Sequence, residues 1–398
     1  DGETLVLTYT VSATDDDGAP LDDKETVTVT ITGTNDSPDV YVDTGDSAAE
    51  PLGKTGSTLT TSGTLTVEDL DLIDSVSSTV SNVATSGDTA GLASNNSELL
   101  AMLASTSGVI DGTETTNTLT WDFNSGSETF DYLATGESLT LTYTITVTDS
   151  QSATDTQNVV ITITGNNDAP VITVETGDSA AETLTETDTT LTSTGTLTVT
   201  DLNLSDTVTS TVTGVVSGGT TAGLGSDNAA LLAMLSSTGT VLDSSETSDQ
   251  LTWNFNSGSE AFNYLANGES LTLTYTIEVT DSEGDTDTQN VAITVNGTND
   301  APLITGGPDT SSLTETDSGL TDTGTLTVSD SDRTDNVVAA VDSVAVSGTG
   351  ASSVPGSLDN ATLQSFLSVS PTTILDGTEI TDTLTWDFNS GAEAFDFL

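Results

Sequence analysis

Three acidic elements return at nearly fixed spacing along this chain, and their residue types suit one kind of chemistry. The first is an Asp-x-Asx-x-x-Asp segment, the second an Asn-Asp pair before proline, and the third an aspartate that ends an alternating apolar strand. The first element comprises Asp69, Asp71 and Asp74, then Asp201, Asn203 and Asp206, then Asp330, Asp332 and Asp335. The others comprise Asn35-Asp36, Asn167-Asp168 and Asn299-Asp300, with Asp15, Asp149 and Asp281 as the strand-ending residues. Carboxylate and amide oxygens on flexible loops are the ligands that Ca²⁺ takes, at about 2.3–2.6 Å, and Mg²⁺ suits such loops less because it demands strict octahedral geometry.

The composition excludes most other chemistry. The chain has 62 acidic residues against 3 basic ones, and a formal net charge of −59. Phosphate recognition needs clustered Lys or Arg, so nucleic acid is excluded as a partner, and an anionic membrane surface is disfavoured. Cysteine and histidine are both absent, which rules out the usual structural zinc sites, thiol nucleophiles and histidine-based triads. No apolar run is long enough to predict a membrane span.

Catalysis by paired carboxylates and binding of sugars are the remaining alternatives of another class. Glycoside hydrolysis uses one carboxylic acid and one carboxylate beside a sugar. Here the acids repeat with the surrounding sequence, a pattern typical of a spacer, and we expect no enzymatic activity. Trp121, Trp253 and Trp386 are each followed two residues later by phenylalanine, which predicts core positions and not an exposed platform for carbohydrate.

The chain is a tandem array with a period of about 132 residues. Gly33-Thr-Asn-Asp-Ser-Pro38 returns as Gly165-Asn-Asn-Asp-Ala-Pro170 and as Gly297-Thr-Asn-Asp-Ala-Pro302. A period of this length is that of a whole domain. We predict the C-terminal part of a repeat at 1–37, complete repeats at 38–169 and 170–301, and the N-terminal part of a repeat at 302–398. We expect the sequence to be part of a longer array. The alternative is a filament whose neighbouring copies complete each other's partial repeats.

Alternating apolar residues and threonines predict half-buried antiparallel strands. In Leu139–Thr148 the residues Leu139, Leu141, Tyr143, Ile145 and Val147 should face inward. Similar strands are predicted at 159–163, 196–199, 208–216 and 251–255. Five to eight short strands per repeat, separated by Gly, Asn and Asp, indicate an all-β fold of tandem immunoglobulin-like β-sandwich domains.

One segment per repeat has helical spacing behind a capping residue. These segments are 97–104, 228–235 and 360–367. Leu99, Met102 and Leu103 need cover, so we predict a short helix that plugs the sandwich; a helix that binds a partner is the alternative.

In such a sandwich the three acidic elements should meet at the junctions between repeats. The loop between the last two strands, the loop after the second strand and the entering linker all lie at one end of the domain. The first junction would contain Asn35, Asp36, Asp69, Asp71, Asp74 and Asp149. The second would contain Asn167, Asp168, Asp201, Asn203, Asp206 and Asp281. The third would contain Asn299, Asp300, Asp330, Asp332 and Asp335.

We predict that Ca²⁺ binds at these junctions. Carboxylates gathered at a hinge repel one another until a divalent cation bridges them, so the bound junction should be stiff and the calcium-free one loose. The alternative interpretation is that these are turn residues, because Asp and Asn favour turns with or without a metal ion. Glu50, Glu182, Glu186 and Glu315 could add ligands, although Lys54 stands where the next repeat has Glu186.

Three sequence motifs together resemble those of a known family. They are Gly-Thr-Leu-Thr-Val-x-Asp-x-Asp, the strand Leu-Thr-Leu-Thr-Tyr-Thr-Ile-x-Val-Thr-Asp, and the closing Gly-Thr-Asn-Asp-Ala-Pro. They resemble the VCBS-type, cadherin-like repeats of large RTX-type bacterial surface adhesins, and the linker is similar to the Asp-x-Asn-Asp-x-Pro junction of cadherins. The resemblance implies calcium-ligand roles for Asn167, Asp168, Asp201 and Asp206. The helix at 228–235 departs from the shorter repeats of that family.

These observations predict a secreted, extracellular stalk of a bacterial adhesin or surface filament that is stiffened by calcium. Its partners would be neighbouring repeats of the same polypeptide, or other copies in a filament, with a role in cell adhesion or biofilm. End-to-end assembly of copies is the competing function, and a carbohydrate-binding module is the third.

Overall fold

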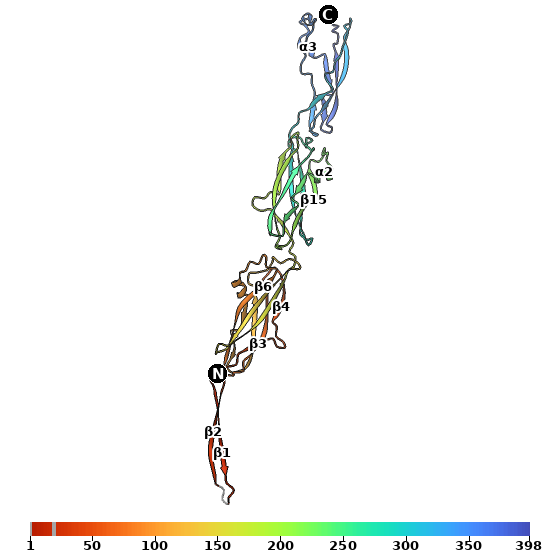
Figure 1. Cartoon of the computed structure of the whole chain (residues 1–398). Helices are drawn as coiled ribbons and strands as arrows, with labels where there is room; N and C mark the ends of the chain where they lie inside the picture. Colours follow the sequence, from red (N-terminus) through yellow and green to blue (C-terminus); the bar gives the residue numbers. More distant parts are fainter. Residues whose placement is uncertain (1, 18–20) are drawn as a thin grey trace. The chain divides into compact units, whose positions relative to one another are not determined.

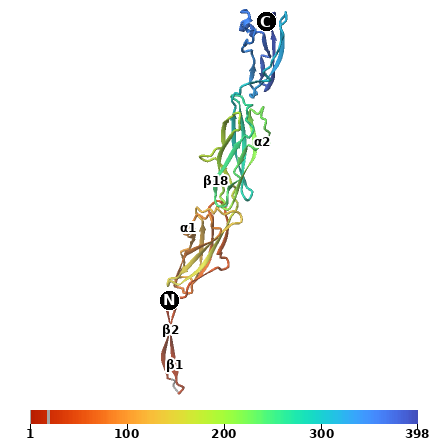
Figure 2. The same ribbon diagram turned by 45° about the horizontal axis from the view of Figure 1, so that its top comes forward.

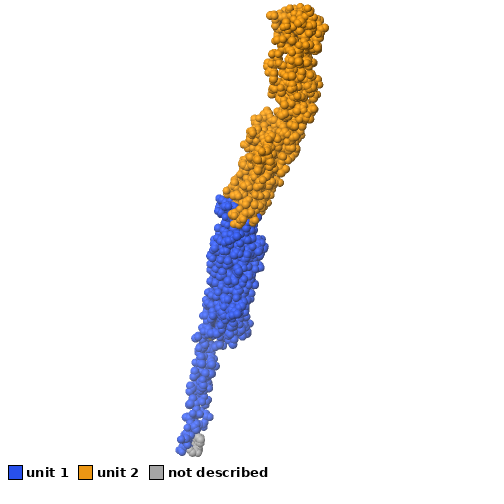
Figure 3. Space-filling view, turned by 90° about the vertical axis from the view of Figure 1, so that its right-hand side faces the viewer, with its two compact units in different colours: residues 1–169, 201–207, 242–247 blue, residues 170–200, 208–241, 248–398 orange. Residues whose placement is uncertain are grey.

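A computed structural model describes residues 2–17 and 21–398 (Figure 1). The chain divides into two compact units, coloured separately in Figure 3. Unit 1 comprises residues 1–169, 201–207 and 242–247, and unit 2 comprises residues 170–200, 208–241 and 248–398. Short segments of the second predicted repeat therefore belong to unit 1. The repeat boundaries themselves remain a prediction from the sequence.

Residues 38–169 of unit 1 form two sheets that enclose one core. The first sheet has the strand order β3 (Asp39–Tyr41), β5 (Thr60–Glu68), β9 (Thr116–Asn124) and β7 (Leu103–Ser105). The second has the order β4 (Ala49–Gly53), β11 (Thr154–Thr164), β10 (Ser138–Thr148), β6 (Ser75–Gly87) and β8 (Gly108–Asp111). Strands β3, β4 and β6 mark the two layers in Figure 1.

The strand order defines the fold class. The first part of the repeat contributes β3 to one sheet, antiparallel to β5, and β4 to the other, parallel to β11. Together with the antiparallel pairs β5–β9, β6–β10 and β10–β11, this is the Greek-key arrangement of an immunoglobulin-like or cadherin-like sandwich. The predicted all-β class is confirmed. The number of strands is nine and not five to eight, because β3, β7 and β8 are three- or four-residue strands without a clear alternation.

The alternating strand forms the middle of the core, as predicted. All five inward residues of β10 have no exposed surface, while the intervening threonines are partly exposed. Opposite them, Trp121 and Phe123 of β9 are buried, and Phe123 meets Tyr143 edge-on with ring centroids 6.3 Å apart. Apolar burial on both inner faces is what holds the two sheets together.

Each predicted helix is present but ends earlier than the pattern indicated. They are α1 (Asn96–Ala101, labelled in Figure 2), α2 (Asn228–Leu232) and α3 (Asn360–Gln364). Asn95 caps α1 in a capping box with Glu98, and Leu99 packs into the core. The prediction was wrong at the C-terminal end, because Leu103 starts strand β7 and pairs with Phe123. Buried Leu99 supports the plug and not an exposed partner-binding helix.

The N-terminal segment of unit 1 is a hairpin of β1 (Thr4–Thr14) and β2 (Asp22–Thr32). Its register matches that of β10 and β11, with Tyr9 opposite Val27 as Tyr143 is opposite Val159. Unlike its counterparts, it is exposed on both faces, and Tyr9 is 53% exposed. Asp15 lies at the end of β1, where Oδ1 accepts the Leu21 N–H at 3.3 Å.

Unit 2 repeats the architecture. Its first sandwich has the sheets β12-β14-β18-β16 and β13-β20-β19-β15-β17. The bounds are β12 (Val171–Thr173), β13 (Ala181–Thr185), β14 (Thr192–Thr200), β15 (Val208–Gly219), β16 (Leu235–Ser237), β17 (Thr240–Leu242), β18 (Ser248–Asn256), β19 (Ser270–Thr280) and β20 (Thr286–Asn296). Because strand order and parallel pairing equal those of residues 38–169, the two repeats share one fold.

Residues 302–398 of unit 2 form the sheet β21-β22-β26-β24 and the two-stranded sheet β23-β25. The bounds are β21 (Leu303–Thr305), β22 (Thr321–Ser329), β23 (Asn336–Val338), β24 (Leu367–Ser370), β25 (Thr373–Asp376) and β26 (Thr381–Asn389). Trp386 was predicted to be a core residue but is only half-buried, and its indole N–H donates to Asp309 at 2.8 Å. The opposite sheet has too few strands in these residues to cover it.

Candidate metal centre

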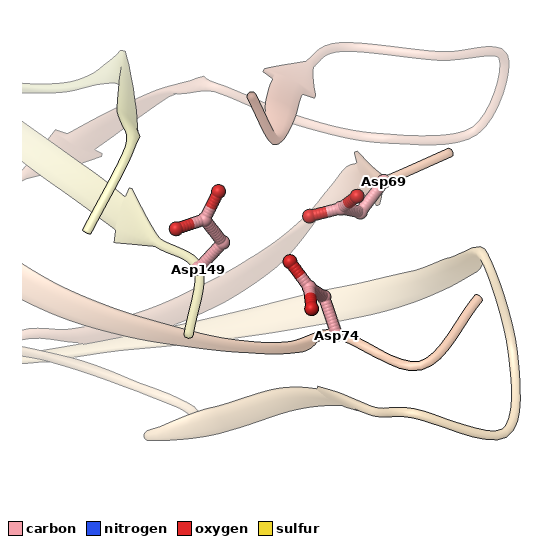
Figure 4. A group of neighbouring side chains, drawn as sticks. All are labelled: Asp69, Asp74 and Asp149. Carbon is pink, nitrogen blue, oxygen red and sulfur yellow. The ribbon is translucent and has the colours of Figure 1, made fainter. Parts of the chain in front are cut away.

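Three buried aspartates converge at one end of the sandwich in unit 1. Asp69, Asp74 and Asp149 each offer one carboxylate oxygen, and these oxygens lie within 4.8 Å of one another. Figure 4 shows the three side chains pointing toward a common space from separate segments of the chain. Asp69 and Asp74 are each 1% exposed. Three carboxylates at this separation could hold a cation between them.

The loop between β5 and β6 holds the first two. The N–H of Asp69 donates to the carbonyl of Thr115 at 2.8 Å, which anchors the end of β5 to the segment before β9. Asp69 Oδ1 accepts the N–H of Asp71 at 3.0 Å, and the Asp71 carbonyl accepts the N–H of Asp74 at 2.9 Å. This turn folds the segment so that Asp74 returns beside Asp69.

The loop between β10 and β11 holds the third. Asp149 Oδ1 accepts the N–H groups of Gln151 and Ala153 at 2.9 and 2.8 Å. One oxygen of the carboxylate thus closes its own loop, and the side chain also contributes an oxygen to the cluster.

The linker completes the arrangement. Asn35 donates through Nδ2 to Asp149 Oδ2 at 2.9 Å, and the N–H of Asp36 donates to Asp71 Oδ2 at 2.7 Å. All six residues predicted for the first junction therefore lie in one network in unit 1. Their role as metal ligands remains a prediction.

The electrostatics of this cluster favour a bound cation. Burial raises the pKa of Asp69, and the nearby charges of Asp74, Asp71 and Asp149 raise it further. Three buried oxygens have no hydrogen-bond partner within the described part of the chain: Asn35 Oδ1, Asp69 Oδ2 and Asp74 Oδ2. Buried acceptors of this kind are costly unless a ligand satisfies them. A Ca²⁺ ion takes such oxygens, so the donor set fits the predicted metal.

The residues predicted for the second junction belong to both units. In unit 1 the N–H of Asp168 donates to Asn203 Oδ1 at 2.7 Å, and Asp201 Oδ1 accepts the N–H of Asn203 at 2.9 Å. Asp201 and Asp206 are buried, and the N–H of Asp206 donates to the Asn203 carbonyl at 3.2 Å. This is the turn of the first set, with asparagine in place of Asp71. Asn167 precedes Asp168 in the same linker.

Asp281 belongs to unit 2, where it ends β19 and is 7% exposed. Its Oδ1 accepts the N–H groups of Glu283, Gly284 and Asp285 at 3.0, 2.7 and 2.8 Å. It therefore closes its loop as Asp149 does.

The third set lies in unit 2 and has the same local geometry. The N–H of Asp300 donates to Asp332 Oδ2 at 2.7 Å, and Asp330 Oδ1 accepts the N–H of Asp332 at 3.0 Å. The N–H of Asp335 donates to the Asp332 carbonyl at 3.1 Å, and Asn299 donates to the Asp300 carbonyl at 2.8 Å. The linker aspartate is thus bound in the same way in all three sets.

Sequence reasoning treated Lys54 as an irregularity, and its surroundings give it a role. Its ammonium, with a side chain 1% exposed, donates to Asp168 Oδ2 at 2.7 Å and to the carbonyls of Asp131 and Leu133 at 3.0 and 2.9 Å. The signal in the sequence was a positive residue at a position where the next repeat has Glu186. The acceptors could not be found that way, since two of them are backbone oxygens more than 75 residues away in the chain.

No known protein family matches the sequence, and no curated protein matches it either. Solved structures of cadherin repeats align with the chain. Protocadherin gamma B2 extracellular cadherin domains 1–5 align at 12% identity with a TM-score of 0.36, over 98% of this chain and 60% of that one. Mouse protocadherin-24 EC1–3 aligns at 13% identity with a TM-score of 0.28, over 73% of this chain and 79% of that one. These scores are too low to carry an argument, so the strand order described above is what assigns the cadherin-like sandwich.

No helix in residues 2–17 and 21–398 has the length and apolar character needed to cross a membrane.

Proposed function

We propose that this chain is a calcium-stiffened segment of an extracellular stalk, of the kind that large bacterial surface adhesins use to hold a binding module away from the cell. The observation that carries the proposal is the buried group Asp69, Asp74 and Asp149, tied to the linker residue Asn35. A cation bound there would join two loops of one sandwich to the chain that enters it.

The physical basis of the proposed stiffening is that a cation turns repulsion between carboxylates into attraction. Without a cation, the three carboxylates repel one another across a few ångströms of partly desolvated space. The loops can then separate only by loosening the linker that donates to Asp149 and Asp71. A divalent cation converts the repulsion to shared attraction and holds all these segments together.

The rest of the chain fits a mechanical role. A fold repeated along the chain, with no histidine or cysteine and three basic residues, is suited to spanning distance and not to catalysis. The absence of enzymatic activity is accordingly part of the proposal. A high negative charge keeps such an array soluble and discourages association between chains.

Calcium titration of the full chain tests the proposal. Calorimetry should detect calcium binding. Calcium should also raise the midpoint temperature of unfolding, and small-angle scattering should show a longer and less variable chain with calcium than with EDTA. Scattering profiles that are the same with calcium and with EDTA would contradict the stalk.

End-to-end assembly is a second candidate because of one observation. The β1–β2 hairpin exposes Leu5, Tyr9 and Val11 on a single face, each by more than half, where their counterparts in β10 are buried. A sheet from another copy could cover that face. Assembly depends on protein concentration whereas stiffening does not, so light scattering over a concentration series with and without EDTA separates the two.

A further inference from the structure

Two equivalent positions in consecutive repeats carry opposite charges. Lys54 follows β4 and Glu186 follows β13, 132 residues later. Their backbones are held in the same way: the N–H of Lys54 donates to the Thr164 carbonyl at 2.9 Å, and the N–H of Glu186 donates to the Asn296 carbonyl at 2.8 Å. Both residues are buried, at 5% and 2% exposed. The two repeats thus have the same structural position, filled by lysine in one and by glutamate in the other.

In unit 1 this site contains its own cation. The Lys54 ammonium contacts Asp168 Oδ2 and the carbonyls of Asp131 and Leu133. Asn203 Nδ2 donates to the same two carbonyls, at 3.1 and 3.2 Å. The ammonium balances the charge of the Asp168 carboxylate, and each of the two carbonyls accepts a hydrogen bond from Lys54 and one from Asn203.

In unit 2 the two donors are replaced by carboxylates. Glu186 stands in place of Lys54, and Asp332 stands in place of Asn203. With Asp300 in place of Asp168, the site has three carboxylates and no ammonium. The linker N–H of Asp300 still donates to Asp332, which fixes Asp332 at the position of Asn203.

Two oxygens of this second site lack donors. Glu186 Oε1 accepts the N–H of Thr298 at 2.9 Å and also the hydroxyl of Thr298. Asp332 Oδ1 and Asp300 Oδ2 are buried without a hydrogen-bond partner in the described residues, and Asp332 is only 1% exposed. Two buried acceptors without donors are costly, and a cation would satisfy them.

The backbone around both sites is preserved. A Cβ on Gly165 would lie 2.5 Å from the Leu133 oxygen, and a Cβ on Gly297 would lie 2.2 Å from the Leu265 oxygen. Leu265 O therefore lies against its linker as Leu133 O does. Leu133 O contacts the Lys54 ammonium, so Leu265 O is placed to contact a cation at the equivalent point.

We propose that Glu186, Asp300 and Asp332, with the carbonyl of Leu265, bind a divalent cation of the calcium type at the place that the Lys54 ammonium fills in the preceding repeat. The array then has two kinds of junction. The one that contains Lys54 and Asn203 has a built-in cation at this site and needs no metal ion there. The one that contains Glu186 and Asp332 is sensitive to calcium. This inference deepens the proposed function and rests on it.

Exchanging the side chains of the two sites tests the inference on the full chain. Glu186→Lys/Asp332→Asn reproduces the donor set of the first site, and Glu175→Lys/Asp249→Asn makes the same change in charge at two exposed positions. Calorimetry with calcium should find one ion fewer per chain in the first variant and an unchanged number in the second. In EDTA the first variant should unfold at a temperature several degrees higher than the wild type, whereas the second should shift it little.

The reciprocal variant extends the test. Lys54→Glu/Asn203→Asp should gain one calcium ion per chain and lose thermal stability in EDTA, with the loss restored by calcium. Circular dichroism establishes that each variant keeps its β structure. An unchanged number of ions in Glu186→Lys/Asp332→Asn would overturn the inference while leaving the stalk standing. Loss of the ion without any effect of calcium on scattering would instead overturn the stalk and leave the site standing.

Discussion

At the scale of single residues, one aspartate side chain performs two tasks with its two oxygens. Asp69 and Asp149 each use Oδ1 to accept backbone N–H groups of their own loops. The second oxygen of each serves another purpose: Asp69 Oδ2 is buried without a hydrogen-bond partner in the described residues, and Asp149 Oδ2 accepts from Asn35. The turn interpretation of these residues and the metal interpretation are therefore compatible, because different atoms of one side chain serve them.

The substitution Asp74→Asn tests the metal interpretation. It keeps the shape of the side chain and a carbonyl acceptor for the Ser150 hydroxyl, which donates to Asp74 Oδ1 at 3.0 Å. We expect calcium affinity to fall at least about tenfold, equivalent to about 1.4 kcal/mol. In EDTA the variant should be as stable as the wild type or more stable, since one repelling charge is gone. Asp122→Asn, at an exposed position of β9, is the control for calorimetry and thermal unfolding. An equal loss of calcium affinity in both variants would argue against a metal site in this cluster.

The pH dependence of the calcium-free chain should report on Asp332. Burial and the charges of Asp300, Asp335 and Asp330 raise its pKa to about 6. An acid with a raised pKa in the folded state is destabilised by ionisation. The penalty is therefore absent below the pKa of an unfolded aspartate, about 3.9, and complete above the folded value.

Lowering the pH from 7 to 5 in EDTA should accordingly increase the free energy of unfolding of the domain that contains Asp332, by on the order of 1 kcal/mol. Denaturant unfolding at a series of pH values measures this. The variant Asp332→Asn should lack the Asp332 part of the gain, so an identical pH profile in that variant would refute the assignment.

At the scale of elements, close packing between neighbouring strands of one sheet fixes the position of a core side chain. Gly63 of β5 lies opposite Trp121 of β9, and a Cβ on Gly63 would lie 2.4 Å from the indole ring. The indole N–H donates to the Ser47 carbonyl at 2.9 Å, so the ring cannot move without losing that bond. Gly195 and Trp253 repeat this arrangement in unit 2.

Gly63→Ala should therefore lower the free energy of unfolding by about 2 kcal/mol, within the usual cost of overpacking a core. Gly53→Ala is the matched control, because a Cβ there meets no atom within 4 Å and the backbone needs no positive φ. Denaturant unfolding compares the two. Similar stabilities of the two variants would mean that the Trp121 ring is free to shift.

The helix is tied to the alternating strand by one buried hydrogen bond. The Tyr143 hydroxyl donates to the Leu99 carbonyl of α1 at 2.9 Å, and Tyr275 donates to Leu231 of α2 at 3.0 Å. Tyr143→Phe leaves the Leu99 carbonyl with the Met102 N–H as its remaining donor, and loss of the hydroxyl bond should cost about 1 kcal/mol of unfolding free energy. Tyr275→Phe should have the same effect in unit 2. Hydrogen exchange should show faster opening of residues 96–101 in the first variant alone, and unchanged exchange would count against this tie.

At the scale of the whole molecule, net charge governs stability. With 62 acidic residues and 3 basic ones, the calcium-free folded state repels itself. Adding NaCl to about 0.5 M in EDTA should raise the midpoint temperature of unfolding, because the screening length falls below about 10 Å. With saturating calcium the effect of NaCl should be smaller. Thermal unfolding at several salt concentrations measures both effects. An equal effect of NaCl with and without calcium would contradict the idea that bound calcium neutralises the acidic clusters.

Local pattern was enough to predict much of the fold. The alternation in Leu139–Thr148 predicted which of its side chains are buried, because period two is a property of an extended strand itself. The capping asparagine and leucine spacing predicted α1 but not its end, because the pairing of Leu103 with Phe123 is a contact between distant segments. Trp386 was predicted to be buried from its local context, whereas its cover depends on an opposing sheet.

The candidate site divides in the same way. The sequence by itself determined which acids recur and, through the strand order that the repeats predict, that three loops meet at one end of each domain. Only the tertiary structure decided which oxygens remain without donors, and that Lys54 is held by the carbonyls of Asp131 and Leu133. The reason is physical: residue type and spacing specify local hydrogen bonding and periodicity, but the charge balance of a buried site is a sum over groups that only folding brings together.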